Sequence, residues 1–175
     1  VTLADTSVAG NVVFASTVKG NQDLILNVAG STTFHHAVGG GDATTAIGDG
    51  TGASLTVNSS GATEFQSSLR TAQGIAQANA AGTITFRQNV DVLGGTTASD
   101  FQGSVVLDGL TFTSAGAITF GSATPNQDAL TVSTDLVTIT TASANGVVTI
   151  NADTDITAPL TISTGSGNIV LNGTV

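Results

Sequence analysis

The sequence predicts an all-β protein, and three observations support that prediction. Apolar residues alternate with polar ones in short runs, and each run ends at Gly, Asn, Asp or Ser. This period of two is typical of strands with one buried and one wet face. Only 9% of the residues are charged, while Thr, Ser and Asn are frequent and 22 glycines can supply the turns. Phenylalanines also recur at intervals near 20 residues.

The alternating runs predict about thirteen strands, which follow one another through the chain with little room for helix. Two stretches depart from the pattern. Residues 39–52 are rich in glycine and are expected to form a loop, because they hold too few apolar residues for a strand. Residues 66–81 contain several alanines and are the one candidate helix, although Gly74 in the middle weakens that assignment. The runs are residues 12–18, 24–28, 33–38, 55–57, 84–92, 105–112, 118–120, 130–132, 136–139, 147–150, 156–162 and 169–171.

The spacing of the phenylalanines favours a parallel β-helix, or β-solenoid. The steps from Phe14 to Phe34, Phe65 to Phe86 and Phe101 to Phe120 are 20, 21 and 19 residues. A repeat of this length matches one coil of a solenoid, stacked about 4.8 Å above the coil before it. A repeat of β-sandwich type is the alternative, since its hairpins also return at about this interval.

Four phenylalanines are followed four residues later by an apolar residue, and positions i and i+4 of one strand share a face. Each pair is therefore expected to point into one core, together with Phe112 and Phe120. The pairs are Phe14/Val18, Phe34/Val38, Phe65/Leu69 and Phe86/Val90.

The composition excludes several classes of partner. Twelve acidic against three basic residues give a net charge of −9, so nucleic acid is not an expected partner. No run of about 18 apolar residues occurs, and direct membrane insertion is not expected. Cys and Met are absent and Lys19 is the only lysine. Together with the abundance of Thr, Ser and Gly, this favours an extracellular or cell-surface protein.

A short segment near the start recurs at the end with an offset of 157 residues. Residues 167–175, Gly-Asn-Ile-Val-Leu-Asn-Gly-Thr-Val, match residues 10–18, Gly-Asn-Val-Val-Phe-Ala-Ser-Thr-Val, at five of nine positions. The chain is therefore interpreted as one all-β unit, residues 1–175, of a tandem array. Its repeat spans about 10–166, and 167–175 open the next copy. The expected assembly residues are Gly10, Asn11, Val12, Val13, Phe14, Gly167, Asn168, Ile169, Val170 and Leu171.

Several β-rich runs resemble bacterial filamentous-haemagglutinin-type surface proteins. The likeness extends over most of the chain and is one of style, carried by residues 10–20, 23–30, 32–40, 82–90 and 147–156. The resemblance implies a secreted surface array, often a parallel β-helix, that serves in adhesion or as a stalk. It carries over no functional residue, because the motifs of that family are structural.

Calcium is the one ion that the sequence suggests. Asp42 and Asp49 lie in the glycine-rich loop, while Asp153 and Asp155 place two carboxylates at alternate positions. Hard cations bind clustered oxygen ligands of this kind. Turn residues supply the alternative reason for Asp and Gly at such places, and no other cofactor is expected.

Catalysis is not expected. The chain has no Cys, Tyr or Trp, and Glu64 is the only glutamate. His35 and His36 are adjacent, so in a strand they point to opposite faces and cannot share one site. The sequence thus predicts a structural repeat of an extracellular filament or adhesin stalk whose partners are copies of itself. A cell-surface module that binds host or matrix glycans is the alternative, although Trp and Tyr, the usual sugar-stacking residues, are missing.

Overall fold

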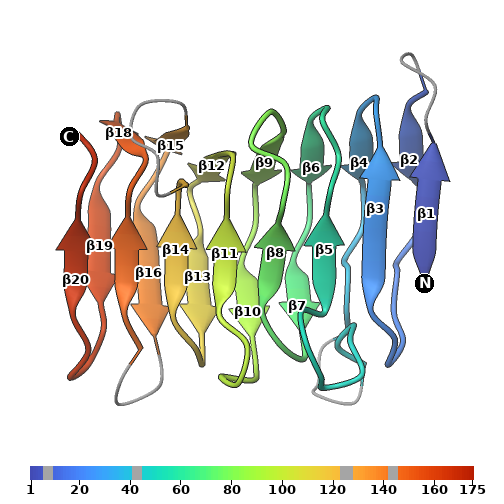
Figure 1. Ribbon diagram of the computed structural model, residues 1–175, viewed down its shortest axis with the longest axis horizontal. Coiled ribbons are helices and arrows are strands. Elements are labelled where there is room, and N and C mark those ends of the chain that lie inside the picture. Colours follow the sequence, from blue (N-terminus) through green and yellow to red (C-terminus); the bar gives the residue numbers. More distant parts are fainter. Residues whose placement is uncertain (6–9, 41–44, 123–127, 142–145) are drawn as a thin grey trace.

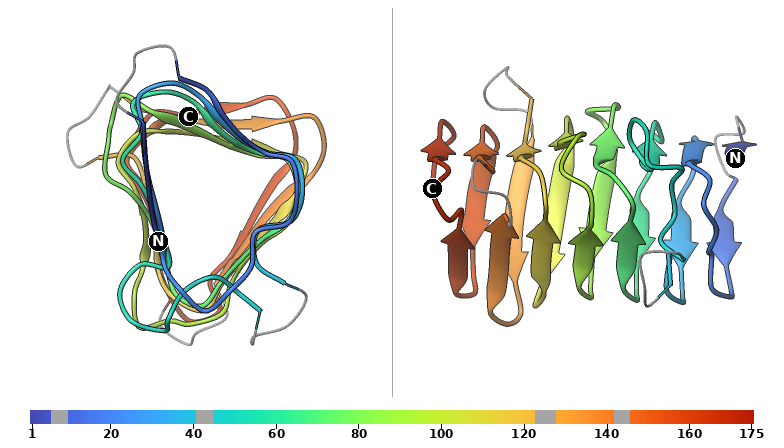
Figure 2. Two further views of the ribbon diagram at one scale, coloured as in Figure 1. Left: turned by 90° about the vertical axis from the view of Figure 1, so that its right-hand side faces the viewer. Right: turned by 90° about the horizontal axis from the view of Figure 1, so that it is seen from below.

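The computed structural model describes residues 1–5, 10–40, 45–122, 128–141 and 146–175. These residues contain twenty strands and no helix. The strands wind into a rod of triangular cross-section, with the two ends of the chain at opposite ends of the rod (Figures 1 and 2). The chain is a parallel β-solenoid of about seven coils, which confirms the favoured prediction over the β-sandwich.

Each side of the triangle is one sheet, and the chain visits the three sheets in turn. Sheet A contains β1 (Thr2–Asp5), β3 (Leu24–Val28), β5 (Leu55–Val57), β8 (Ile75–Gln77), β11 (Ser99–Phe101), β14 (Ile118–Phe120), β17 (Val148–Ile150) and β20 (Ile169–Leu171). Sheet B contains β2 (Val12–Phe14), β4 (Thr32–Phe34), β6 (Thr63–Phe65), β9 (Thr83–Phe86), β12 (Ser104–Asp108), β15 (Ala129–Ser133) and β18 (Asp153–Ile156). Sheet C contains β7 (Leu69–Thr71), β10 (Val90–Val92), β13 (Thr111–Ser114), β16 (Val137–Thr141) and β19 (Leu160–Ser163).

Every pairing between these strands is parallel, and the register places like residues above one another. The inward-facing column of sheet B begins with Phe14, Phe34, Phe65 and Phe86. Consecutive rings of this column are stacked, with centroids 4.4, 4.7 and 5.4 Å apart. The alternating pattern of the sequence thus becomes a continuous apolar core along the rod axis.

The expected core phenylalanines do fill this interior. Phe34, Phe65, Phe86, Phe112 and Phe120 are fully buried, whereas Phe14 in the first coil is only partly buried. Phe101 is a further core residue that the expected set omits. It stacks on Phe120 with centroids 5.3 Å apart and is fully buried.

The phenylalanine and the apolar residue four positions later do not share a strand, so the predicted reason for their common direction is wrong. Phe65 ends β6 in sheet B, while Leu69 begins β7 in sheet C. Val18 and Val38 likewise form isolated bridges in line with sheet C. Both members of each pair face the core because the chain turns a corner of the triangle between them.

The candidate helix over residues 66–81 is also wrong, because this stretch contains β7 and β8. Inward-facing Thr71 and Gln77 are buried and break the apolar pattern that identifies other strands. Gln77 is accommodated because its side-chain Nε2 donates to the backbone oxygen of Gly82 at 2.8 Å. The glycine-rich stretch 39–52 contains no named strand in its described part, as expected for a loop.

The number of strands exceeds the expected thirteen because several apolar runs contain a corner. Residues 84–92, for example, hold the end of β9 and the whole of β10, with a bend at 87–89 between them. Polar residues at the corner do not interrupt the run strongly enough for the sequence pattern to divide it.

Glycines form a column at the corner between sheets A and B, where successive coils approach closely. A Cβ atom at Gly30 would lie 1.9 Å from the oxygen of Gly10, and one at Gly61 would lie 2.2 Å from the oxygen of Gly30. Gly103 repeats the pattern against Gly82 at 2.5 Å. The spacing of the coils at this corner therefore requires glycine, because no side chain fits against backbone at these distances.

We expect Gly61→Ala to destabilise the fold by about 3 kcal/mol, because the new methyl group must push two coils apart. Gly50→Ala is the matched control. Gly50 has a φ of +89° but no atom within 4 Å of an added Cβ, so only the backbone strain remains, about 1 kcal/mol. Urea unfolding followed by far-UV circular dichroism measures both. Equal losses of stability in the two variants would refute the close-approach explanation.

Candidate functional site: the two open ends of the solenoid

The expected assembly residues lie at the two ends of the rod. Residues Gly10 to Phe14 include β2, which is the outermost strand of sheet B at the N-terminal end. Residues Gly167 to Leu171 include β20, which is the outermost strand of sheet A at the C-terminal end. In the described residues neither end is covered by a helix. An outermost strand presents unpaired N–H and C=O groups, to which a further strand can pair.

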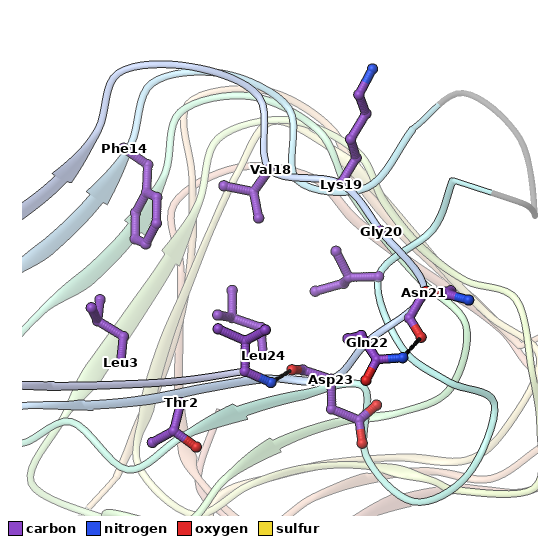
Figure 3. A pocket seen from close by; sticks show the side chains of 12 residues that line it. Thr2, Leu3, Phe14, Val18, Lys19, Gly20, Asn21, Gln22, Asp23 and Leu24 are labelled. Carbon is purple, nitrogen blue, oxygen red and sulfur yellow. Dashed lines mark hydrogen bonds between the residues drawn. The ribbon is translucent and has the colours of Figure 1, made fainter.

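The N-terminal end of the rod opens into the core through an apolar cavity of about 290 Å³. Leu3, Phe14, Val18 and Leu24 line it, and Figure 3 shows their side chains converging while Lys19 points away. Leu3 lies in register with Leu26, and Phe14 with Phe34, both of which are fully buried one coil further in. The cavity is thus the cross-section of the hydrophobic core, uncovered because no coil lies above it.

The C-terminal end exposes the same core from the other side. Ile169 and Leu171 are 46% and 56% exposed, although their register partners Val148 and Ile150 are buried. Ile156 in β18 is 42% exposed, and its register partner Val132 is fully buried. These side chains face inward, and they contact solvent only because they belong to the last coil. Both ends therefore present apolar side chains surrounded by open strand edges.

Two of the three basic residues form ion pairs between coils on the sides of the rod. Arg70 Nη2 lies 2.9 Å from Asp91 Oδ2, on adjacent strands of sheet C. Arg87 donates to both Glu64 and Asp108, each at 2.5 Å, and so joins three successive coils. Glu64 and Asp108 raise the pKa of Arg87, first through the hydrogen bond to Glu64. Arg70 and Arg87 thus serve the coil stacking, and the sides remain acidic overall.

The residues suggested for calcium lie at two separate places. Asp42 is outside the described residues. Asp49 lies beside Asp23 near the N-terminal end, where its backbone N–H donates to Asp23 Oδ1 at 3.3 Å. Asp153 and Asp155 are in β18 at the C-terminal end. Among the residues that the structure describes, no three His, Cys, Asp or Glu side chains gather into a group.

The carboxylates of Asp49 and Asp153 instead receive hydrogen bonds from threonines. Thr174 donates to Asp153 Oδ1 through its hydroxyl at 2.7 Å and its backbone N–H at 3.2 Å. These bonds lower the pKa of Asp153 below its ordinary 3.8, with the hydroxyl contributing most. Thr51 lowers the pKa of Asp49 in the same way. Asp153 therefore ties the closing segment to the coil beneath it.

We expect Thr174→Val to raise the pKa of Asp153 toward 3.8, because the variant loses the hydroxyl donor and keeps the side-chain shape. A lowered pKa means that this contact stabilises the fold above pH 3.8 and is lost as the pH falls through the pKa of the folded state. Titration of the carboxyl by NMR measures the shift. Thr51→Val is the control, which should move Asp49 and leave Asp153 unchanged; a shift of Asp153 in the control contradicts the assignment.

The histidine pair provides no catalytic arrangement in the described residues. His35 Nδ1 lies 2.7 Å from Gln66 Oε1, in a contact between neighbouring coils, and His36 is exposed. No helix in the described part of the chain is long and apolar enough to cross a membrane. The features that distinguish this molecule chemically are thus its two open ends. Comparison with family models, curated proteins and solved structures finds no match to the chain.

Proposed function

We propose that the chain is a structural unit of an extracellular bacterial surface filament or adhesin stalk, in which copies join end to end by β-strand pairing. One observation carries the proposal: inward-facing apolar side chains are exposed at both ends of the solenoid and are buried in every coil between. Ile169 and Leu171 at one end, and Leu3 and Phe14 at the other, belong to the same columns of the core.

A second copy fits these ends because the fold itself shows how one coil sits on another. All three sheets are parallel and run along the rod, so the outer edge of each last strand has the polarity of every interior edge. Adding a copy extends the hydrogen-bonded ladders and covers the apolar cavity in one step. A continuous ladder along the axis suits a spacer or stalk, since tension is shared among many hydrogen bonds.

The composition supports an exposed, long-lived role. The chain has no Cys or Met to oxidise and one Lys, and its wet faces consist largely of Thr, Ser and Asn. Its resemblance to filamentous-haemagglutinin-type surface proteins points to the same setting. A glycan-binding module is less well supported, because the chain has neither Trp nor Tyr to stack on a sugar ring.

Sedimentation and negative-stain electron microscopy of the purified chain test the proposal. With a net charge of −9 per copy, the ends repel at low ionic strength, so association should strengthen as salt is added. We expect rods of constant width whose length grows with protein concentration and with salt. A compact monomer at every concentration and ionic strength would refute end-to-end assembly by this chain.

A further inference from the structure

The two similar segments, residues 10–18 and 167–175, do not lie on the same side of the rod. β2, in the first segment, belongs to sheet B, whereas β20, in the second, belongs to sheet A (Figure 1). If the second segment opens the next copy, as the sequence predicts, then sheet A of one copy must continue as sheet B of the next.

The path of the chain after each strand is equivalent, one face out of phase. After β2 the chain turns a corner, and Val18 pairs with Val38 in line with sheet C. After β20 it turns a corner in the same way, and the oxygen of Thr174 accepts a hydrogen bond at 2.8 Å from the N–H of Thr154 in sheet B. In both segments the strand is thus followed, three to four residues later, by a contact on the next face.

We propose that successive copies in the array are turned by one third of a turn about the rod axis. Sheet A holds eight strands, so β1 and β20 are seven coils apart, and β2 lies one face after β1. The step from β2 to β20 is therefore seven coils less one face, a rise of roughly 32 Å at 4.7–4.9 Å per coil. This inference rests on the proposed end-to-end assembly and specifies its geometry.

The turned arrangement places apolar side chains over apolar side chains on all three faces. β4 of the next copy, with Phe34 inward, lies over β20 with Leu171 inward. β3, with Leu26 inward, lies over β19 with Ile162 inward. Val18 lies over β18, where Ile156 is exposed. Each exposed core residue of the last coil is thereby covered, and each side of the filament displays the three sheets in succession.

Disulfide trapping in a tandem chain tests the turn. In the test chain, residues 19–175 follow directly after Val175, which keeps the 157-residue offset, and the natural sequence has no cysteine. In register, Val170 takes the place of Val13, whose neighbour on the next coil is Thr33. Neighbouring residues of parallel strands lie about 4.8 Å apart, within the range of Cα separations that a disulfide spans.

We expect a disulfide between Cys at 170 of the first copy (Val170→Cys) and Cys at 33 of the second (Thr33→Cys), and none when the second cysteine is at 25 (Ile25→Cys). Ile25 faces outward in sheet A, so it would lie above Val170 only if the copies were not turned. Peptide mapping under non-reducing conditions identifies the bond, and Val13→Cys/Thr33→Cys within one copy is the positive control. Cross-linking to position 25, or to neither position while the control forms, overturns the turned geometry. Failure of the natural chain to form rods would instead overturn the assembly itself.

Discussion

Phe65→Ala is expected to destabilise the solenoid by about 4 kcal/mol, the larger of the effects anticipated within a single chain. Phe65 is 1% exposed and lies in the middle of the ring column, between Phe34 at 4.7 Å and Phe86 at 5.4 Å. Its removal leaves a cavity that the stiff ladders on either side cannot close, and it also breaks two stacking contacts. Urea unfolding monitored by far-UV circular dichroism measures the loss.

Phe14→Ala is the matched control for this prediction. Phe14 belongs to the same column but is partly buried, stacks on Phe34 alone and borders the open cavity. Its loss should cost about 2 kcal/mol, since much of its surface is already in water. If the two variants are equally stable, the ring column does not have the axial core role that the structure gives it.

Leu171→Asp is expected to lower end-to-end association by at least about 100-fold, roughly 3 kcal/mol, while the single chain still folds. Leu171 faces inward in the last coil and is 56% exposed, so in an isolated chain a carboxylate there stays in water. In a filament the same carboxylate would be buried against the next core without a partner. Sedimentation velocity over a range of concentrations measures the change in association.

Leu136→Asp provides a closely matched control for that experiment. Leu136 is 54% exposed, but it precedes β16 on the side of the rod rather than at an end. The same gain in negative charge should leave association within about twofold of the natural chain. A similar loss in both variants would mean that general charge repulsion, and not burial at the ends, controls the assembly.

The sequence pattern predicts the fold well wherever inward positions are apolar. The stepped phenylalanines 14, 34, 65 and 86 correspond directly to stacked rings in register. The pattern fails at β7 and β8, because Thr71 and Gln77 point inward and their burial depends on hydrogen bonds that form only after folding. An alternation of Leu69 with Thr71, and of Ile75 with Gln77, was present but was obscured by alanine and glycine.

The position of the ends could be anticipated, but their relative orientation could not. The match of residues 10–18 with 167–175 predicts that these segments are related, and both do occupy outermost strands. Which face each occupies depends on the length of every coil, and the coils are unequal: Ile25 pairs with Thr56, whereas Thr56 pairs with Ala76. Loops at the corners, including the glycine-rich stretch 39–52, change coil length without changing the strand register.

Amide hydrogen exchange at the last strand tests the end-to-end contact most directly. Asn172 N–H donates to the oxygen of Ile150 at 2.8 Å, so alternation along the parallel ladder directs the Leu171 N–H toward the open edge. On concentrating the protein, exchange at Leu171 should slow at least about tenfold, while Ile84 inside the rod stays equally protected throughout. Exchange at Leu171 that is the same in dilute and concentrated solution would contradict end-to-end strand pairing.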